Sequence, residues 1–295
     1  MHLSTHNWMR AEPLETTVRR IKQYGYESIE ISGEPTQYDV GDTRKLLKDT
    51  GMRCWGAVTL MLEERNLAAK DEGQRAKSVQ YVKDVITMVS ELDGEIVTLV
   101  PATVGKVTPD ATPEEEWKWV VDATKECFDH AKTRGVRIAV EPLNRFETYL
   151  FNRCAQALAL ADAVSPECGV CLDAFHINIE EEDIYDAIRL AGNRLFDFHV
   201  ADNNRFAAGL GHMDWPKIVG TLKEIGYDGA LTNEFVAPVD RTPAAPYPDM
   251  IEKNPVDISP EQLKFIEDHG SSLLSEEFYS DQMRITAETL LPLIK

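Results

Sequence analysis

Short runs of apolar residues alternate along the chain with longer stretches in which apolar residues recur every three or four positions. Runs of the first kind, bounded by turn residues, are typical of buried β-strands, and the second pattern is typical of amphipathic helices. Eight candidate strands follow from the pattern: residues 3–6, 28–32, 53–59, 95–100, 137–143, 169–173, 195–201 and 230–235. The alternation predicts an α/β protein.

The segment of residues 113–135, between the fourth and fifth candidate strands, shows the start and stop signals of a helix. It begins with Pro113 and three glutamates, and it ends in a basic turn followed by Gly135. Acidic residues at the start and basic residues at the end of a helix both match its dipole. Eight strand–helix units with no break in composition predict a single (β/α)8 TIM barrel over residues 1–295. The alternative, a doubly wound open sheet, ordinarily brings a glycine-rich phosphate loop, and the sequence contains neither GxGxxG nor GxxxxGK[ST].

One segment breaks this rhythm, residues 236–260, which contain six prolines and little periodicity. A long irregular segment after the last strand of a barrel lies on the face that holds the active site. We predict that it forms a lid or a docking surface for a partner, because the apolar Tyr247, Met250 and Ile251 need a surface to pack against. A decoration without a role is the alternative.

Composition and charge narrow the classes of partner. Fifty acidic residues against 31 basic ones give a formal charge of −19, which repels phosphate backbones and anionic lipid. We therefore expect no nucleic acid and no membrane as partner, and no apolar run approaches the roughly 20 residues of a membrane span. The start of the chain lacks the pattern of a signal peptide, and the five cysteines are an odd number, so we expect a cytoplasmic protein.

Cys168 and Cys171 have the CxxC spacing of some metal and redox sites. They lie in a candidate strand, and the sequence contains no second pair that would complete a zinc site. We therefore expect these cysteines to be structural.

Ionisable residues stand at the ends of four successive candidate strands, the fifth to the eighth: Glu141, Asp173, His199 and Glu234. A single carboxylate at such a place is more often a capping residue. The carboxyl ends of barrel strands meet at one mouth, however, and three carboxylates brought together repel one another unless a cation lies among them. Two Glu, one Asp and one His suit Mn²⁺, Mg²⁺ or Co²⁺ better than they suit a thiolate-type zinc site.

Glu147, His176 and Arg205 each follow one of these four residues by three to six positions. A lone residue of these types in a loop is more often solvated or structural, but the repeated spacing favours a ring of groups around a substrate held on the metal. An arginine and a histidine can stabilise the oxygens of an ene-diolate, and a carboxylate can accept a hydroxyl hydrogen bond. Trp8 and Trp55 either stack on a sugar ring or fill the barrel, and both alternatives stay open.

Four motifs, EPLNRFE, LDAFHINIEE, FHVADNNR and EIGYDGALTNE, occur in this order with barrel spacing. Together they resemble the sugar-phosphate isomerase/epimerase superfamily, the xylose-isomerase-like TIM barrels. Within it they are most similar to the ketose 3-epimerases that act on tagatose, psicose and related sugars. The similarity is clearest over residues 137–235, a third of the chain, and the eight-unit pattern extends it over most of the rest.

The resemblance implies roles for the site residues. By it, the four strand-end residues bind one divalent ion, most often Mn²⁺, and two of them, Glu141 and Glu234, face the two sides of the sugar and move the proton at C3. Residues matching Glu147, His176 and Arg205 hold the O1 and O2 oxygens of the substrate. All seven positions carry the residue that the resemblance requires.

Other parts of the chain depart from the epimerases. The second and third strands, IEISGEP and RCWGAVTLM, and the segment VTLVPATVGK do not match epimerase sequence, and the chain after the eighth strand is longer. These parts resemble another branch, the catalytic α subunits of C-glycoside deglycosidases. That resemblance implies cleavage of the C–C bond between a 3-oxo sugar and an aromatic aglycone, with a small β subunit bound in a hetero-oligomer. The early strands that contain tryptophan and the Pro-rich segment could supply an apolar slot and a closed mouth for the aglycone.

Both branches share the difficult step, in which a base removes a proton beside a carbonyl and a metal stabilises the ene-diolate. The first hypothesis is a metal-dependent sugar lyase of the C-deglycosidase type with a small partner subunit. The alternative is a ketose 3-epimerase that works alone or as a homo-oligomer. An endonuclease IV-like repair enzyme is disfavoured by seven histidines and a charge of −19, since it needs a His-rich three-metal cluster and a cationic face. A non-catalytic sugar-binding barrel is disfavoured because the mutually repelling carboxylates are intact.

Overall fold

The computed structural model describes residues 1–240, 242–251, 258–269 and 273–295. Eight parallel strands form one sheet in the order β1-β8-β7-β6-β5-β4-β3-β2. The strands are β1 (His2–Thr5), β2 (Ser28–Ser32), β3 (Arg53–Val58), β4 (Ile96–Leu99), β5 (Arg137–Val140), β6 (Gly169–Asp173), β7 (Leu195–Val200) and β8 (Ala230–Asn233). A parallel bridge between His6 and Glu30 joins the two outer strands of this order, so the sheet forms a nearly closed barrel. The predicted (β/α)8 TIM barrel is confirmed.

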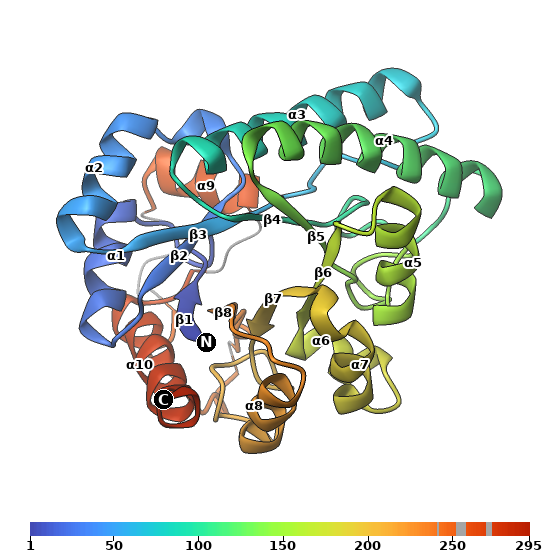
Figure 1. The fold of residues 1–295 in the computed structure, drawn as a ribbon. Helices are drawn as coiled ribbons and strands as arrows, with labels where there is room; N and C mark the ends of the chain where they lie inside the picture. Colours follow the sequence, from blue (N-terminus) through green and yellow to red (C-terminus); the bar gives the residue numbers. More distant parts are fainter. Residues whose placement is uncertain (241, 252–257, 270–272) are drawn as a thin grey trace.

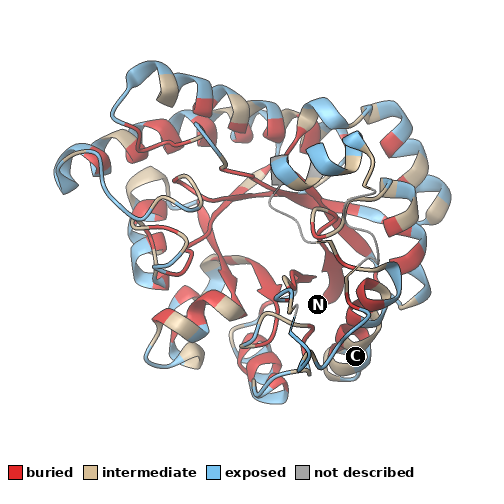
Figure 2. Cartoon of the chain, turned by 180° about the vertical axis from the view of Figure 1, so that it is seen from behind, coloured by how far each residue is buried: buried red, intermediate tan, exposed pale blue. Residues whose placement is uncertain are grey.

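Helices surround the barrel (Figure 1). They are α1 (Leu14–Gln23), α2 (Val40–Thr50), α3 (Glu72–Glu91), α4 (Pro113–Arg134), α5 (Cys154–Val164), α6 (Ala174–Glu180), α7 (Ile184–Ala191), α8 (Trp215–Glu224), α9 (Pro260–His269) and α10 (Glu276–Ile294), with 3-10 turns η1 (Pro35–Gln37) and η2 (Gly192–Arg194). Figure 2 shows the buried strands at the centre and exposed faces on the surrounding helices. Among the described residues, no helix has both the length and the apolarity needed to cross a membrane.

Helix α4 shows how local sequence produces these elements. The Thr112 side chain accepts a hydrogen bond from the Glu115 N–H, and the Glu115 carboxylate accepts one from the Thr112 N–H, which is the reciprocal pair of a capping box. Pro113 occupies the first helical position, where an N–H has no partner within the helix. Gly135 ends the helix with a φ of 69°, a left-handed conformation that favours glycine. Both predicted helix signals are confirmed.

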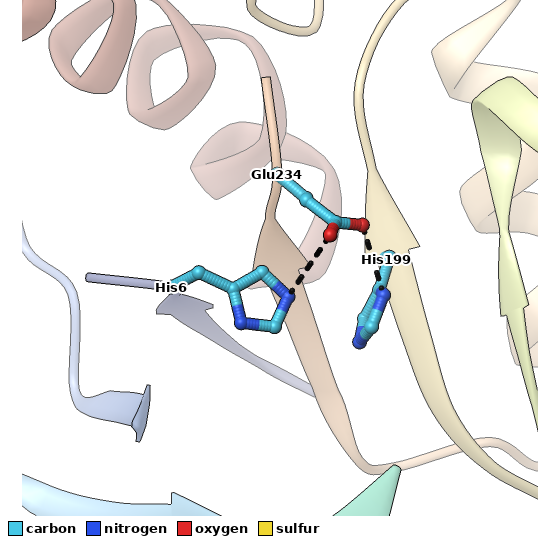
Figure 3. Close-up of side chains that lie close together, drawn as sticks. All are labelled: His6, His199 and Glu234. Carbon is cyan, nitrogen blue, oxygen red and sulfur yellow. Dashed lines mark hydrogen bonds and ion pairs between the residues drawn. The ribbon is translucent and has the colours of Figure 1, made fainter. Parts of the chain in front are cut away.

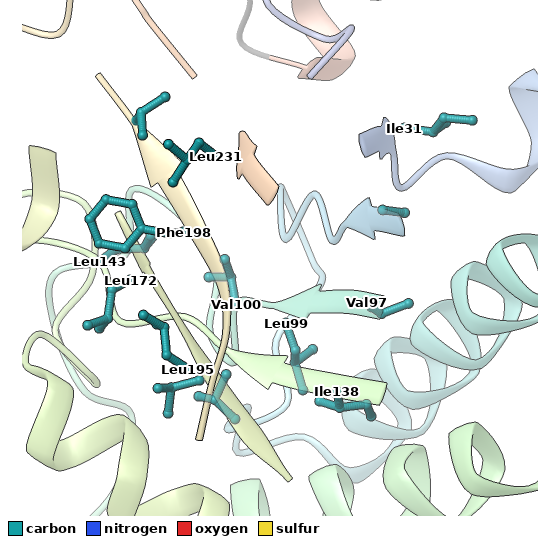
Figure 4. Close-up of a cluster of buried hydrophobic side chains, with 14 of the residues drawn as sticks. Ile31, Val97, Leu99, Val100, Ile138, Leu143, Leu172, Leu195, Phe198 and Leu231 are labelled. Carbon is teal, nitrogen blue, oxygen red and sulfur yellow. The ribbon is translucent and has the colours of Figure 1, made fainter. Parts of the chain in front are cut away.

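Apolar side chains of the strands pack outward against the helices (Figure 4); they include Ile31, Val97, Leu99, Ile138, Leu172, Phe198 and Leu231. A smaller cluster of Trp55, Ile96, Ala139, Cys171 and Ala230 fills the barrel towards the amino ends of the strands. Cys168 belongs to the outer cluster and Cys171 to the inner one, so the two thiols of the CxxC sequence belong to different clusters. All five cysteines are buried and free, and this separation fits the expectation of structural cysteines.

Part of the Pro-rich segment after β8 packs onto the barrel. The Tyr247 ring lies 5.4 Å from the Phe206 ring and 5.5 Å from the Phe278 ring, measured between centroids. Met250 is buried, and its carbonyl accepts a hydrogen bond from the N–H of Ser275. Arg241 and residues 252–257 lie outside the described residues. The lid or docking role of residues 236–260 therefore stays a prediction.

His2 carries a test of the energetics at the amino end of the barrel. Burial is the main cause that lowers the pKa of His2 to about 4, and the positive charge of Arg53 is the second. The folded protein therefore holds this side chain neutral. An unfolded chain protonates it near pH 6.5, and the unfolding free energy therefore decreases as pH falls from 6.5 towards 4.

We expect His2 to contribute about 2 kcal/mol to the loss of unfolding free energy between pH 7 and pH 5. Urea denaturation of the wild type and of His2→Gln at both pH values measures this contribution. The variant should lose less stability on acidification by that amount. An identical loss in both proteins would contradict the shifted pKa of His2.

Candidate active site

The four strand-end residues converge at the carboxyl mouth of the barrel. Glu141 directly follows β5, Asp173 ends β6, His199 lies in β7 and directly opposite Asp173, and Glu234 directly follows β8. The backbone N–H groups of Glu141 and Glu234 still donate to the neighbouring strands, at 2.9 and 3.0 Å, which anchors both residues. All four side chains are buried.

His199 lies between the two glutamates. Its Nδ1 is 3.1 Å from Oε1 of Glu141 and also 3.1 Å from Oε2 of Glu234. Figure 3 shows His199 and His6 on either side of the Glu234 carboxylate. The Nε2 of His6 is 3.8 Å from Oε1 of Glu234, so each oxygen of this carboxylate faces a different imidazole.

The donor set fits a divalent cation. Several groups of three residues offer ligand atoms that all lie within 4.8 Å of one another. One group contains Glu141 and Asp173, a second contains Glu141 and His199, and a third contains His199 and Glu234. The Oδ2 atom of Asp173 is buried and has no hydrogen-bond partner among the described residues. Buried carboxylate oxygens and one imidazole nitrogen are ligands that hard divalent ions accept, so these residues could hold such an ion.

The electrostatics of the site are those of crowded, buried acids. Burial raises the pKa of Asp173 well above its ordinary value, and the charge of Glu234 raises it further. Burial also raises the pKa of Glu141. Burial acts on Glu234 in the same direction, but the neighbouring His199 and His6 outweigh it and hold the pKa of Glu234 below its ordinary value. The two glutamates predicted to transfer protons thus have pKa values shifted in opposite directions.

A cavity of about 90 Å³ lies next to these groups. Six of the predicted site residues line it: Trp8, Glu141, Glu147, His176, Arg205 and Glu234. The rest of the lining is largely apolar and comes mainly from β3, β4 and the loops after them: Val58, Thr59, Leu60, Met61, Leu62, Val100, Val104 and Leu143. The cavity therefore has a polar part next to strands β5 to β8 and an apolar part next to β3 and β4.

The predicted substrate-holding residues form one hydrogen-bonded network. Nη1 of Arg205 donates to Oε1 of Glu147 at 2.8 Å, and the Asn144 amide donates to the same oxygen at 2.9 Å. The Asn144 amide also lies 2.9 Å from Nδ1 of His176, which is buried and whose pKa burial and the Arg205 charge lower well below its ordinary value. His176 is therefore a neutral imidazole. The network fixes the side chains of Glu147, His176 and Arg205 at the wall of the cavity.

Arg205 itself has a φ of 60°, the left-handed region that non-glycine residues rarely adopt. Its N–H donates to the Asp202 carbonyl, and its own carbonyl accepts from the Val236 N–H, both at 2.8 Å. Its guanidinium lies 4.7 Å from the centre of the Phe175 ring, and its Nε is buried without a hydrogen-bond partner among the described residues. Backbone strain of this kind is typical of functional sites.

A sequence profile of the family described as "Xylose isomerase-like TIM barrel" matches residues 18–269. The chain belongs to this family. The L-ribulose 3-epimerase of Methylomonas sp. (strain DH-1) is 30% identical over 213 residues, which are 71% of this chain and 74% of that protein. The D-psicose 3-epimerase of Agrobacterium fabrum is 29% identical over 227 residues, which are 74% of this chain and 77% of that protein.

The crystal structure of the D-allulose 3-epimerase from Methylomonas sp. in complex with D-allulose has the same fold as this member of the xylose isomerase-like family. The two superpose with a TM-score of 0.81 at 23% identity, over 100% of this chain and 97% of that chain. The predicted resemblance to xylose-isomerase-like barrels and ketose 3-epimerases is confirmed. The relatives named here are epimerases, so they favour the alternative hypothesis over cleavage of a C-glycoside.

One predicted site residue lies elsewhere. Trp55 stands near the start of β3, and it lines a hollow at the amino ends of the strands together with His2 and Arg137. Its ring packs in the inner cluster, at the opposite end of the barrel from the cavity at the mouth. The structure therefore does not bring Trp55 to the cavity at the mouth, because strand residues that far before the carboxyl end do not reach it, and the substrate-binding role of Trp55 stays a prediction. Of its two alternatives, filling the barrel is the one that the fold supports.

Sequence reasoning about this family member missed several residues of the site. His6 directly follows β1, and the four candidate ligands likewise lie at or near the ends of their strands. This position in the sequence was the signal that could have identified His6 as a site residue. Asn144 lies inside EPLNRFE, but nothing in the sequence indicates that it contacts both Glu147 and His176. Glu30 stands in the otherwise apolar run SIEIS, where a charged residue is itself a signal.

Proposed function

We propose that this protein is a divalent-metal-dependent ketose epimerase that inverts C3 of its substrate, with Mn²⁺ as the ion. The observation that carries the proposal is the convergence of Glu141, Asp173, His199 and Glu234 beside a cavity. The same cavity is lined by the neutral His176 and by the Arg205–Glu147 pair. The similarity to L-ribulose and D-psicose 3-epimerases supports a ketose as the substrate.

Four residues would hold the ion: Glu141, Asp173, His199 and Glu234. When bound, the ion supplies positive charge that stabilises the negative charge of an ene-diolate. Arg205 and His176 orient the O1 and O2 oxygens by hydrogen bonding, and Glu147 accepts a hydroxyl hydrogen bond. The buried part of the wall, which includes Val58, Met61 and Val100, limits the access of water to the proton that is being moved.

Glu141 and Glu234 exchange the proton at C3 in this proposal. One carboxylate removes the proton from one face of the sugar, and the other returns a proton to the opposite face, which gives the epimer. Because the two carboxylates face opposite sides of the substrate, either one can act as the base, and the other, once protonated, can act as the acid.

A second candidate function is favoured by the apolar part of the cavity. Val58, Leu60 and Met61 from the end of β3 and the loop after it offer no partner for sugar hydroxyls, but they suit an aromatic aglycone. In that reaction, a 3-oxo-C-glycoside loses its C2 proton, the electrons expel the aglycone from C1, and the aglycone carbon takes up a proton. The chain would then be the catalytic α subunit of a C-glycoside deglycosidase that works with a small β subunit.

Incubation of the purified protein and Mn²⁺ with L-ribulose, D-psicose or D-fructose in D₂O tests the proposal. We expect the 3-epimer to form without any partner protein and to carry deuterium at C3, measured by NMR. A parallel incubation with a 3-oxo-C-glycoside distinguishes the second candidate. Aglycone release there, combined with no exchange at C3 of any of the three ketoses, would overturn ketose epimerisation and favour the lyase.

A further inference from the structure

We propose that Glu30 is a positioning residue of the metal site: it accepts the Nε2 hydrogen of His199 and so leaves Nδ1 free to bind the ion. The inference rests on the proposed function, because it takes His199 as a metal ligand. Glu30 lies in β2, three strands away from β7 around the barrel, so sequence spacing does not connect the two residues.

The two nitrogens of His199 face different groups. Nδ1 lies 3.1 Å from an oxygen of Glu141 and from an oxygen of Glu234, the other candidate ligands. Nε2 lies 3.3 Å from Oε2 of Glu30 and 3.6 Å from Oδ2 of Asp197. His199, Glu30 and Asp197 all have 0% exposure, so no bulk water can satisfy Nε2.

The chemistry of imidazole decides which nitrogen carries the hydrogen. A neutral imidazole has one N–H and one lone pair, and a metal ion takes the lone pair. Because Nδ1 faces the ligand carboxylates, Nε2 must carry the hydrogen when the ion is bound. A buried N–H without an acceptor costs about 1–3 kcal/mol, so Nε2 needs an acceptor on the far side of the ring.

Within the described part of the chain, the carboxylates within 4.0 Å of Nε2 are those of Glu30 and Asp197. Asp197 already accepts three hydrogen bonds, from the Phe198 N–H at 2.9 Å and from the hydroxyls of Thr98 and Thr232 at 3.4 Å each. Asp197 is therefore held by other donors and is the more distant of the two.

In the part of the chain that the structure describes, Glu30 has no backbone or hydroxyl donor of this kind; its ionisable neighbours inside the barrel are His199 and Asp197. Both of its carboxylate oxygens, and Nε2 of His199, are buried without a hydrogen-bond partner among the described residues. Their separation of 3.3 Å is within reach of a hydrogen bond, although the two groups are not aligned for one. A buried carboxylate without a donor is costly, so a small rotation of either group satisfies both. Carboxylates that accept the second N–H of a metal-binding histidine commonly orient its ring in this manner.

The backbone explains why Glu30 points to His199. The register of β2 against β3 shifts between Ile29 and Glu30, and such an irregularity re-aims the side chain beside it. The bridge between Glu30 and His6 then holds this part of β2 against β1. Glu30 is thereby fixed inside the barrel, on the amino side of the ligand set.

Three variants test the inference. Glu30→Met removes the acceptor and keeps the length of the side chain, whereas Glu30→Gln keeps one acceptor oxygen without the charge. Ser4→Ala is the matched control, because Ser4 is a fully buried strand residue whose hydroxyl has no hydrogen-bond partner in the described part of the chain. The dissociation constant for Mn²⁺ is measured on metal-stripped proteins from the EPR signal of free Mn²⁺.

We expect Glu30→Met to bind Mn²⁺ about 10- to 100-fold more weakly than the wild type. Glu30→Gln should lose less, and Ser4→Ala should match the wild type. The ¹⁵N NMR spectrum of His199 in the Mg²⁺-loaded protein, assigned by its absence in His199→Gln, should show the hydrogen on Nε2, and this Nε2–H resonance should shift in Glu30→Met. A merely structural role of Glu30 would not shift this resonance.

Unchanged Mn²⁺ affinity in both Glu30 variants, with an unchanged His199 spectrum, would overturn the inference alone. If Glu30→Met does not fold, Glu30→Gln decides: an Nε2–H resonance at its wild-type position would show that no hydrogen bond to residue 30 exists. A wild-type protein that binds no divalent cation would overturn the proposed function and this inference with it.

Discussion

Glu234→Gln is expected to reduce kcat/KM by at least about a thousandfold, because a positioned acid–base group alone contributes about 10²- to 10⁴-fold. Glutamine keeps the shape of the side chain but can neither accept the C3 proton nor supply the charge of a metal ligand. Glu141→Gln should cause a loss of the same order, since the two carboxylates act on opposite faces of one substrate. Steady-state kinetics with the ketose that proves active measure both losses.

The matched control for these variants is Glu116→Gln. Glu116 is also a buried glutamate, but it lies in α4 and accepts hydrogen bonds from the N–H of Asp110 and from the Tyr149 hydroxyl, away from the cavity at the mouth. We expect this variant to lose stability and to keep its activity. Circular dichroism should show a folded barrel in all three variants. Full activity in Glu234→Gln or Glu141→Gln would refute their assignment as proton-transfer residues.

Removal of divalent ions by a chelator is expected to abolish activity and to lower the melting temperature. Without a cation, the buried carboxylates of Glu141, Asp173 and Glu234 repel one another. The site then also lacks the positive charge of the ion, which stabilises the ene-diolate. Mn²⁺ at a hundred times its dissociation constant should restore about 2.7 kcal/mol of stability, by the linkage of binding to folding. Turnover assays and thermal melts before and after addition of Mn²⁺ measure both effects.

His199→Gln provides the control for metal removal. It lacks one proposed ligand, so Mn²⁺ should raise its melting temperature much less than that of the wild type. Full turnover by the stripped wild type, or an equal response to Mn²⁺ in the two proteins, would contradict the assigned ligand set. The comparison also separates binding at this site from non-specific binding to the acidic surface, since the formal charge is −19.

The outcome for the two tryptophans shows where sequence reasoning ended. Trp8 follows the carboxyl end of β1 and lines the cavity, whereas Trp55 lies near the amino end of β3 and fills the bottom of the barrel. From the sequence, either tryptophan could stack on a sugar ring or fill the barrel, and the residue type does not decide between the two. The position along the strand decides between them, because only residues at or beyond the carboxyl end reach the mouth.

The sequence predicts the residues of the site more clearly than the reaction that they catalyse. Both candidate reactions need the same removal of a proton beside a carbonyl, so Glu141 and Glu234 do not by themselves select one reaction. The family relatives favour epimerisation, and the apolar lining from β3 and β4 is the feature that keeps an aglycone-bearing substrate as a second candidate.

The sequence by itself determined the barrel, the strand ends and the candidate ligand set. Each of these follows from local information: the period of the apolar residues, the caps of the helices, and an ionisable residue placed where an apolar run stops. Parallel strands of a barrel bring such ends to one mouth, so Glu141, Asp173, His199 and Glu234 were predictable without coordinates.

Only the tertiary structure decided which groups touch across the barrel. Contacts of Asn144 with His176, of His6 with Glu234 and of Glu30 with His199 join strands or loops far apart in the sequence. Their distances depend on strand register, on the irregularity in β2 and on the closure of the sheet, none of which the local pattern encodes. The physical reason is that periodicity specifies which face a side chain occupies, whereas packing of the whole barrel specifies what it meets there.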